Sequence, residues 1–179
     1  TIARHLALGD PQRVQRIALL NTEIPGHRPP WIQTLQISMR MPGMQLVMRQ
    51  LLRSQAFRSS GMGFGGCFCD LTLLDGDFHD RFVMPCIRSA QTTEGLTRYL
   101  IGLGWQDVDI LAQRHAEIRR PVLLIWGEAD PTFPIDRARG MIPQFADCRG
   151  LHAIPGARLL VHEEKPREVA AALVPFLLE

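Results

Sequence analysis

Hydrophobic positions near the start of the chain change from a helical to a strand-like spacing. Thr1–Leu8 carries apolar side chains at helical spacing, and the Gly-Asp-Pro segment at 9–11 ends that helix. Val14–Leu20 is then apolar almost throughout and is closed by Asn21. A strand of this kind is typical of a parallel sheet that is covered on both faces. The chain is therefore predicted to open as helix, turn and buried strand.

The middle of the chain follows a different pattern, from Ile24 to about Ala116. Prolines and glycines separate amphipathic stretches with helical spacing. A glycine-rich stretch at 59–66 lacks the Gly-Lys-Ser/Thr ending of a phosphate-binding loop, so it predicts no nucleotide site. The expected helices of this insertion cover Trp31–Met41, Met44–Arg53, Asp77–Ser89 and Thr93–Gly102.

Strand and helix patterns alternate again from Arg120 onward. We expect strands at Pro121–Trp126 and Leu151–Ile154 and helices at Ile135–Phe145 and Pro166–Leu178. This alternation on both sides of a helical block predicts an α/β fold whose parallel sheet is interrupted by a lid. The expected organisation is a core segment at 1–23, a helical cap at 24–116 and a second core segment at 117–179.

Composition and charge narrow the class of protein. The chain has 179 residues, of which 46% are hydrophobic and 21% charged, as in globular domains. Its 20 basic and 18 acidic residues are too evenly balanced to predict a nucleic-acid or membrane partner. No signal peptide opens the chain, and no apolar run approaches the ~20 residues of a membrane span. The four cysteines lack metal-ligand spacing, so we expect reduced cysteines in a cytoplasmic protein without metal or cofactor.

Three stretches, taken together, resemble the α/β-hydrolase superfamily, in particular its haloalkane dehalogenase and epoxide hydrolase-like branch. They are 10–14 (DPQRV) leading into 17–22 (IALLNT), 120–130 (RPVLLIWGEAD), and 154–157 (IPGA) followed by 162–166 (HEEKP). In that family they correspond to the strand after the nucleophile helix, the strand leading to the catalytic acid, and the histidine loop with the last helix. The resemblance implies a partial α/β-hydrolase fold: its C-terminal strands and helices with a helical cap insertion.

The resemblance also implies site residues. Asp130 matches the acid that orients the catalytic histidine, although an Asp before Pro131 is also common in turns. Glu23 is a rival acid, because some haloalkane dehalogenases place theirs after the strand before the cap; otherwise it is a solvated carboxylate at a hinge. Leu159 occupies the usual histidine position. His162, three residues later, is either the base in a rebuilt loop or only a loop residue.

The family nucleophile, a Ser or Asp in a sharp strand-to-helix turn, would lie about four residues before Thr1. We therefore expect a fragment, inactive and poorly stable alone, of a hydrolase that attacks a small ester, halide or epoxide through a covalent intermediate. The alternative is a non-catalytic relative that binds a small apolar ligand in the cap cleft, a reading that Leu159 favours. A transferase or haloperoxidase-type enzyme on the same fold also stays open.

Overall fold

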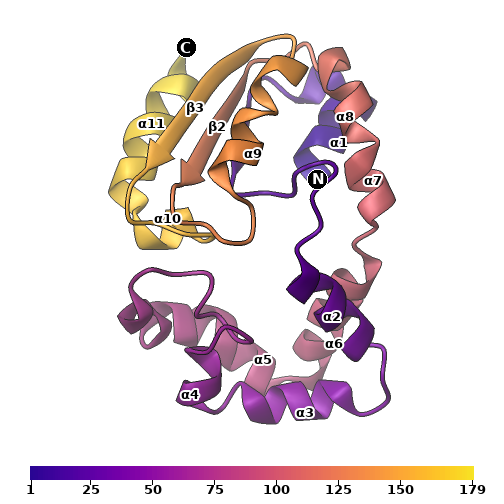
Figure 1. Ribbon diagram of the computed structural model, residues 1–179, viewed down its shortest axis with the longest axis vertical. Helices are drawn as coiled ribbons and strands as arrows, with labels where there is room; N and C mark the ends of the chain where they lie inside the picture. Colours follow the sequence, from indigo (N-terminus) through magenta and orange to yellow (C-terminus); the bar gives the residue numbers. More distant parts are fainter. The chain divides into compact units, whose positions relative to one another are not determined.

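The computed structural model describes residues 1–179, which form two compact units (Figure 1). The first, here called the sheet unit, comprises Thr1–His27 and Trp105–Glu179; the second, the helical unit, comprises Arg28–Gly104. The helical unit is narrower than the 24–116 range expected for the cap. The segment after Gly104 belongs to the sheet unit, where Leu111 and His115 are completely buried.

Three parallel strands form the sheet, in the order β1-β2-β3. They are β1 (Ile17–Leu20), β2 (Val122–Gly127) and β3 (Cys148–Ile154). All three lie where the sequence predicted strands, with bounds that differ by a few residues. The central strand, β2, is buried along its whole length, as its uninterrupted apolar sequence predicts.

Helices cover both faces of the sheet. On one face Leu123 and Ile125 pack against α10 (Val161–Glu164) and α11 (Pro166–Leu178), with Val169 and Phe176 of α11 in the same buried cluster. Side chains alternate along a strand, so Leu124 and Trp126 point to the opposite face. There α9 (Ile135–Arg139) packs against β2. The fold is therefore α/β with a covered parallel sheet, as predicted.

The helix expected at Ile135–Phe145 is wrong in its second half. Helix α9 ends at Arg139, and the chain continues through Gly140 into η5, a single turn at Ile142–Gln144. Pro143 cannot donate the backbone hydrogen bond that a continuing α-helix needs, which explains the break. The other short elements of the sheet unit are α1 (Ile2–Gly9), η1 (Pro11–Arg13), α7 (Trp105–Asp109), α8 (Leu111–Arg114) and η4 (His115–Glu117).

The helical unit is built around aromatic and aliphatic side chains. Phe78 packs against Phe64 and Phe68, with ring centroids 5.3 and 5.0 Å apart and the rings nearly perpendicular. Its elements are α2 (Pro30–Ser38), α3 (Met44–Leu51), α4 (Gln55–Arg58), η2 (Leu71–Leu74), η3 (His79–Val83), α5 (Met84–Arg88) and α6 (Ala90–Gly102). None of the helices in either unit has the length and apolar character needed to cross a bilayer.

Candidate active site

Asp130 lies just beyond the carboxyl end of β2 and is 4% exposed. Its Oδ2 accepts a hydrogen bond from Asn21 Nδ2 at 2.7 Å, and its Oδ1 accepts one from the Thr132 N–H at 2.8 Å. Burial raises the pKa of Asp130, while these hydrogen bonds, one from the Phe133 N–H and the charge of His27 act in the opposite direction. The structure therefore holds a buried carboxylate at the end of the central strand, where parallel sheets gather their functional groups.

Asn21 connects the ends of two strands. Its Oδ1 accepts a hydrogen bond from the Gly127 N–H at 2.9 Å while its Nδ2 donates to Asp130. The residue has a positive φ of 29°, a conformation that asparagine tolerates better than most side chains. A single side chain thus fixes the Asp130 carboxylate relative to both β1 and β2. The sequence analysis assigned Asn21 only to the end of a strand.

The loop after β3 lies against the Asp130 turn. The Ala129 N–H donates to the Ala157 carbonyl at 3.0 Å. A Cβ on Gly127 would lie 2.5 Å from the Arg158 carbonyl oxygen, so only glycine permits this approach. The main chain before Leu159, the position where the resemblance leads one to expect histidine, is therefore fixed close to the end of β2.

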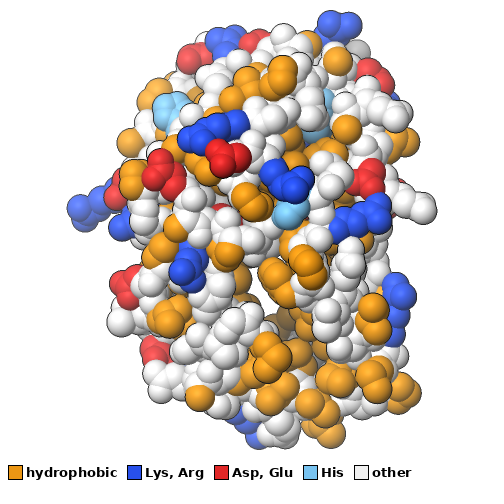
Figure 2. All heavy atoms as spheres, viewed as in Figure 1, with side chains coloured by type: hydrophobic (Ala, Val, Ile, Leu, Met, Phe, Trp, Pro, Cys, Tyr) orange, Lys and Arg blue, Asp and Glu red, His pale blue; other side chains and the backbone are white.

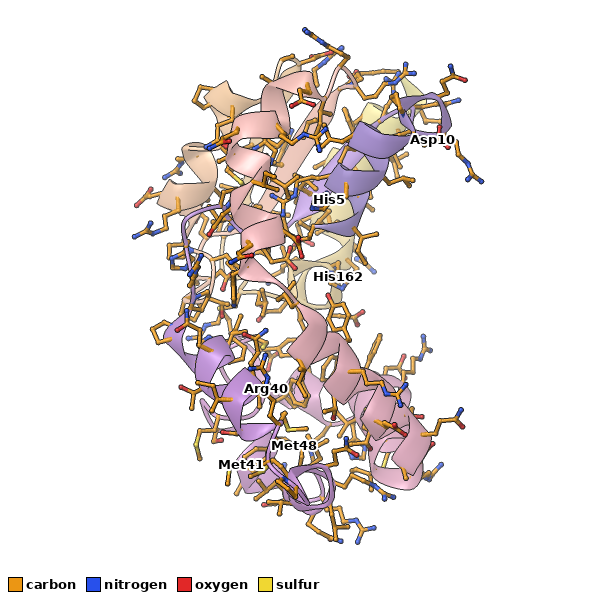
Figure 3. All side chains as sticks on the ribbon, turned by 90° about the vertical axis from the view of Figure 1, so that its right-hand side faces the viewer. His5, Asp10, Arg40, Met41, Met48 and His162 are labelled. Carbon is orange, nitrogen blue, oxygen red and sulfur yellow. The ribbon has the colours of Figure 1, made fainter.

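His162 lies in α10, with its side chain 50% exposed (Figure 3). Its Nε2 is 3.8 Å from Oε1 of the neighbouring Glu163. No hydrogen bond or ion pair connects His162 to Asp130, whose carboxylate oxygens accept from Asn21 and from the Thr132 N–H. The structure thus does not bring the two predicted site residues into contact.

The histidine associated with the Asp130 turn is His27, which the sequence analysis did not select. Its Nε2 lies 2.8 Å from the carbonyl oxygen of Thr132, whose N–H donates to Asp130. Its ring also packs edge-on against Phe133, with centroids 6.1 Å apart. A carbonyl can only accept, so Nε2 is the donor of this hydrogen bond, and Nδ1 is the nitrogen that can accept a proton whenever the ring is neutral.

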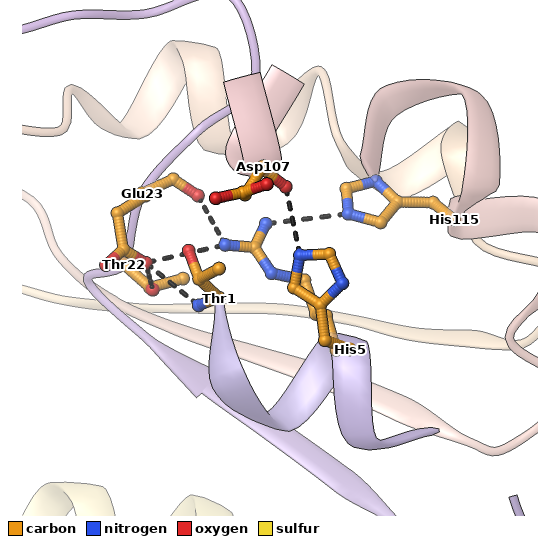
Figure 4. Close-up of polar contacts among 7 residues, drawn as sticks. Thr1, His5, Thr22, Glu23, Asp107 and His115 are labelled. Carbon is orange, nitrogen blue, oxygen red and sulfur yellow. Dashed lines mark hydrogen bonds and ion pairs between the residues drawn. The ribbon is translucent and has the colours of Figure 1, made fainter. Parts of the chain in front are cut away.

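Glu23 belongs to a different polar cluster, formed around the buried Arg4 (Figure 4). The Arg4 guanidinium donates to the Glu23 carbonyl at 2.8 Å and lies 3.5 Å from its carboxylate. Burial acts to raise the pKa of Glu23, and the hydrogen bond from the Thr22 hydroxyl acts to lower it. Glu23 is therefore an internal ion-pair partner rather than the solvated hinge carboxylate that was considered.

His115 completes this cluster. Its Nε2 is 3.5 Å from the Arg4 guanidinium, its Nδ1 is 2.8 Å from Gln144 Oε1, and its ring stacks on Phe145. Burial, together with the charge of Arg4, lowers the pKa of His115 to about 4 against the opposing effect of the hydrogen bond with Gln144. His115 is thus neutral and packed at ordinary pH, which is a structural role.

A surface cavity of the sheet unit lies apart from the Asp130 turn. A cavity of about 450 Å³ lies among α1, β1 and α11, and its lining includes Leu6, Arg16 and Leu177 but none of the predicted site residues. The Asp130 turn is the better candidate for an active site than this cavity, because its hydrogen bonds define a specific chemical environment. No group of three or more histidine, cysteine, aspartate or glutamate side chains is arranged to hold a metal ion.

Comparisons with known proteins show what this architecture resembles. No protein-family model matches the chain, and no curated protein sequence matches it. A hydrolase from Pseudomonas aeruginosa is 23% identical, with a TM-score of 0.69 over 98% of this chain and 60% of its own. An α/β hydrolase fold protein from Burkholderia ambifaria is 19% identical, with a TM-score of 0.72 over 96% of this chain and 61% of its own. A thermophilic esterase from Thermogutta terrifontis is 17% identical, with a TM-score of 0.69 over 99% of this chain and 60% of its own.

These similarities establish the fold. The chain has part of an α/β-hydrolase fold and spans about 60% of the length of those solved structures. The expected partial fold is therefore confirmed. Membership of the haloalkane dehalogenase and epoxide hydrolase-like branch stays a prediction, because the similar structures include hydrolases of other descriptions.

Proposed function

We propose that this chain is the C-terminal part of a cap-bearing hydrolase that acts on a small ester, halide or epoxide through a covalent intermediate. The observation that carries the proposal is the buried Asp130 carboxylate at the end of β2, held by Asn21. In this mechanism a nucleophile encoded upstream of Thr1 attacks the substrate, and a histidine then activates the water that releases the product. Asp130 stabilises the positive charge that the histidine acquires.

The experiment that tests this role for Asp130 uses the longer product encoded with the sequence upstream of Thr1. Turnover of p-nitrophenyl esters, haloalkanes and epoxides is measured for the parent and for Asp130→Asn. We expect a loss of about 10²–10⁴-fold in kcat, as for removal of a triad acid. Asp136→Asn is the matched control, since that carboxylate is 86% exposed and lies outside the site. Unchanged turnover in Asp130→Asn would contradict the proposal.

Two histidines are candidates for the base. His162 follows from its place in the sequence, whereas His27 is supported by its 2.8 Å contact with Thr132, which in turn binds Asp130. The contact favours His27, because it orients the ring and leaves Nδ1 as the acceptor. In the longer product we expect His27→Gln to lower kcat by about 10²-fold or more and His162→Gln to leave it near the parent value. The reverse result would make His162 the base.

The chain of 179 residues is proposed to be inactive alone, because it contains no residue matched to the family's nucleophile. Turnover of p-nitrophenyl acetate above the level of Asp130→Asn would contradict that. A non-catalytic ligand-binding relative is the second candidate, and Leu159 is the observation that favours it. A longer product that binds small apolar esters without cleaving them, and that carries no Ser or Asp at the elbow, would support this alternative.

A further inference from the structure

Helix α3 leaves its apolar side chains in solvent. It buries none of its eight residues, although five of them are Met, Leu or Val. Leu46 is 59% exposed and Val47 is 47% exposed. An amphipathic helix of a globular protein normally buries its apolar side, so this exposure needs an explanation.

The exposed apolar surface continues onto the end of α2 and the turn that follows. Ile37 is 66% exposed and Met41 is 59% exposed. Hydrophobic side chains gather at the lower right of Figure 2, over the turn between α2 and α3 and over α3, and Figure 3 shows Arg40, Met41 and Met48 in the same part of the helical unit. We call this the α2–α3 surface; its exposed apolar members are Ile37, Met41, Leu46, Val47 and Leu51.

The chain segment that forms this surface carries charges of one sign. No acidic residue occurs between Glu23 and Asp70, whereas the same stretch contains five arginines, of which Arg58 is buried and paired with Asp75. Arg40 and Arg53 are exposed beside the apolar residues, and Arg53 contacts only the neutral Gln50, at 3.1 Å. The helical unit as a whole has eight arginines and five acidic residues, against twelve basic and thirteen acidic residues in the sheet unit.

We propose that the α2–α3 surface docks on an anionic lipid bilayer. Aliphatic side chains would enter the interface between headgroups and acyl chains, and the arginines would meet lipid phosphates and other anionic headgroups. Arginine suits this position because its stem lies along apolar surface while its guanidinium reaches polar groups. The docking is peripheral and goes beyond the proposed hydrolase function.

The chemistry of the surface favours a bilayer over other partners. Nucleic acid would meet the arginines but would gain little from exposed Leu, Val, Ile and Met side chains. A second copy of this chain would bring arginines of one copy toward those of the other, which is unfavourable. The expectation of no membrane partner rested on the net charge of +2 of the whole chain, and the proposal departs from it because the charge is unevenly distributed.

Binding of the purified 179-residue chain to lipid vesicles tests the proposal. Sedimentation is measured with pure phosphatidylcholine vesicles and with mixed phosphatidylcholine–phosphatidylglycerol vesicles. We expect roughly tenfold or tighter apparent binding to the mixed vesicles, falling as NaCl is raised from about 0.05 to about 0.5 M. Equal binding to both kinds of vesicle, or no binding to either, would overturn the proposal.

Matched substitutions locate the binding surface. Leu46→Glu should weaken binding to the mixed vesicles by roughly tenfold, whereas Leu178→Glu, at an 81% exposed position of the sheet unit, should leave it unchanged. Arg53→Glu should weaken binding by a similar factor, and Arg167→Glu, with the same change of net charge, should not. Equal effects of the two leucine variants, or of the two arginine variants, would overturn the assignment to this surface.

Light scattering without vesicles measures the oligomeric state and so tests whether the α2–α3 surface binds a second copy of the chain instead of lipid. A monomer that binds mixed vesicles supports the proposal. A dimer that Leu46→Glu dissociates would overturn it, because the surface would then bind a second copy. Circular dichroism of each variant shows that the helices are retained, so a loss of binding is not a loss of fold.

Discussion

Two regions of the molecule, the buried polar residues Arg4 and Asp130 of the sheet unit and the α2–α3 surface of the helical unit, treat charged and apolar side chains in opposite ways. In the sheet unit the fully buried Arg4 and the buried Asp130 both have hydrogen-bond partners. In the helical unit Leu46 and Met41 face solvent with arginines beside them. The type of a residue therefore does not decide its environment in this molecule. Partners decide which charges are buried, and the lack of a covering element decides which apolar residues are exposed.

The largest difference between these two regions should appear at their arginines. Arg4→Ala removes a buried cation that donates to Glu23, and we expect a loss of about 3–5 kcal/mol in the free energy of unfolding. Arg40→Ala, at an exposed position, should change it by less than about 0.5 kcal/mol. Urea unfolding followed by circular dichroism measures both. Similar losses for the two variants would remove the distinction between the two regions.

Glycine positions provide the next comparison. Gly127→Ala places a Cβ within 2.7 Å of the backbone at Ala157 and Arg158, so we expect the free energy of unfolding to fall by about 2–3 kcal/mol. Gly95 is exposed within α6, and a Cβ added there would meet nothing within 4 Å, so Gly95→Ala should instead raise the free energy of unfolding by about 1 kcal/mol through better helix propensity. The same unfolding assay applies. A neutral Gly127→Ala would show that the loop after β3 moves freely.

The Arg4 cluster predicts a pH dependence that belongs to the sheet unit. The pKa of His115 is about 4 in the folded protein and 6.5 when unfolded, so the unfolded state binds the proton first as pH falls. The stability that neutral His115 provides is present above pH 6.5 and decreases as pH falls toward 4, by about 2–3 kcal/mol. Unfolding curves between these pH values should show the slope in the parent and in His162→Gln. His115→Gln should lack it.

The smallest effect is expected on the exposed face of α3. Leu46→Ala should change the free energy of unfolding by less than about 0.5 kcal/mol, because most of the Leu46 side chain is already exposed to solvent in the folded protein. Leu52→Ala, in the same unit but 5% exposed, should cost about 2–4 kcal/mol. A large loss of stability in Leu46→Ala would mean that the α2–α3 surface is covered in solution and is therefore not free to bind vesicles.

Much of the fold could be predicted from sequence, because its strongest signals are local. The apolar run at Pro121–Trp126 predicts β2, and the amphipathic pattern at Pro166–Leu178 predicts α11 with the bounds that the structure has. The first helix was also predicted, but its buried side was not. Ile2 and Leu6 are exposed and Arg4 is buried, because long-range partners outweigh the apolar stripe.

The candidate site was predictable only in part. The place of Asp130 after a buried strand identified it from local sequence. Its contacts with Asn21 and the neighbouring contact of His27 join residues more than 100 positions apart, and no local motif carries such information. A rule that the carboxyl ends of neighbouring parallel strands meet would have directed attention to both residues. Because Leu159 stands where the resemblance implies a histidine, the sequence alone could not identify the histidine that lies near Asp130.

The glycine at the end of β2 also bears on how this site can evolve. Main-chain contacts with Gly127 and Ala129 fix the loop after β3, so its course does not depend on the side chain at Leu159. Some leucine codons differ from histidine codons by one base. Where the codon of Leu159 is of that kind, a single nucleotide change introduces a histidine into a loop whose main chain already lies against the end of β2, without a new backbone path.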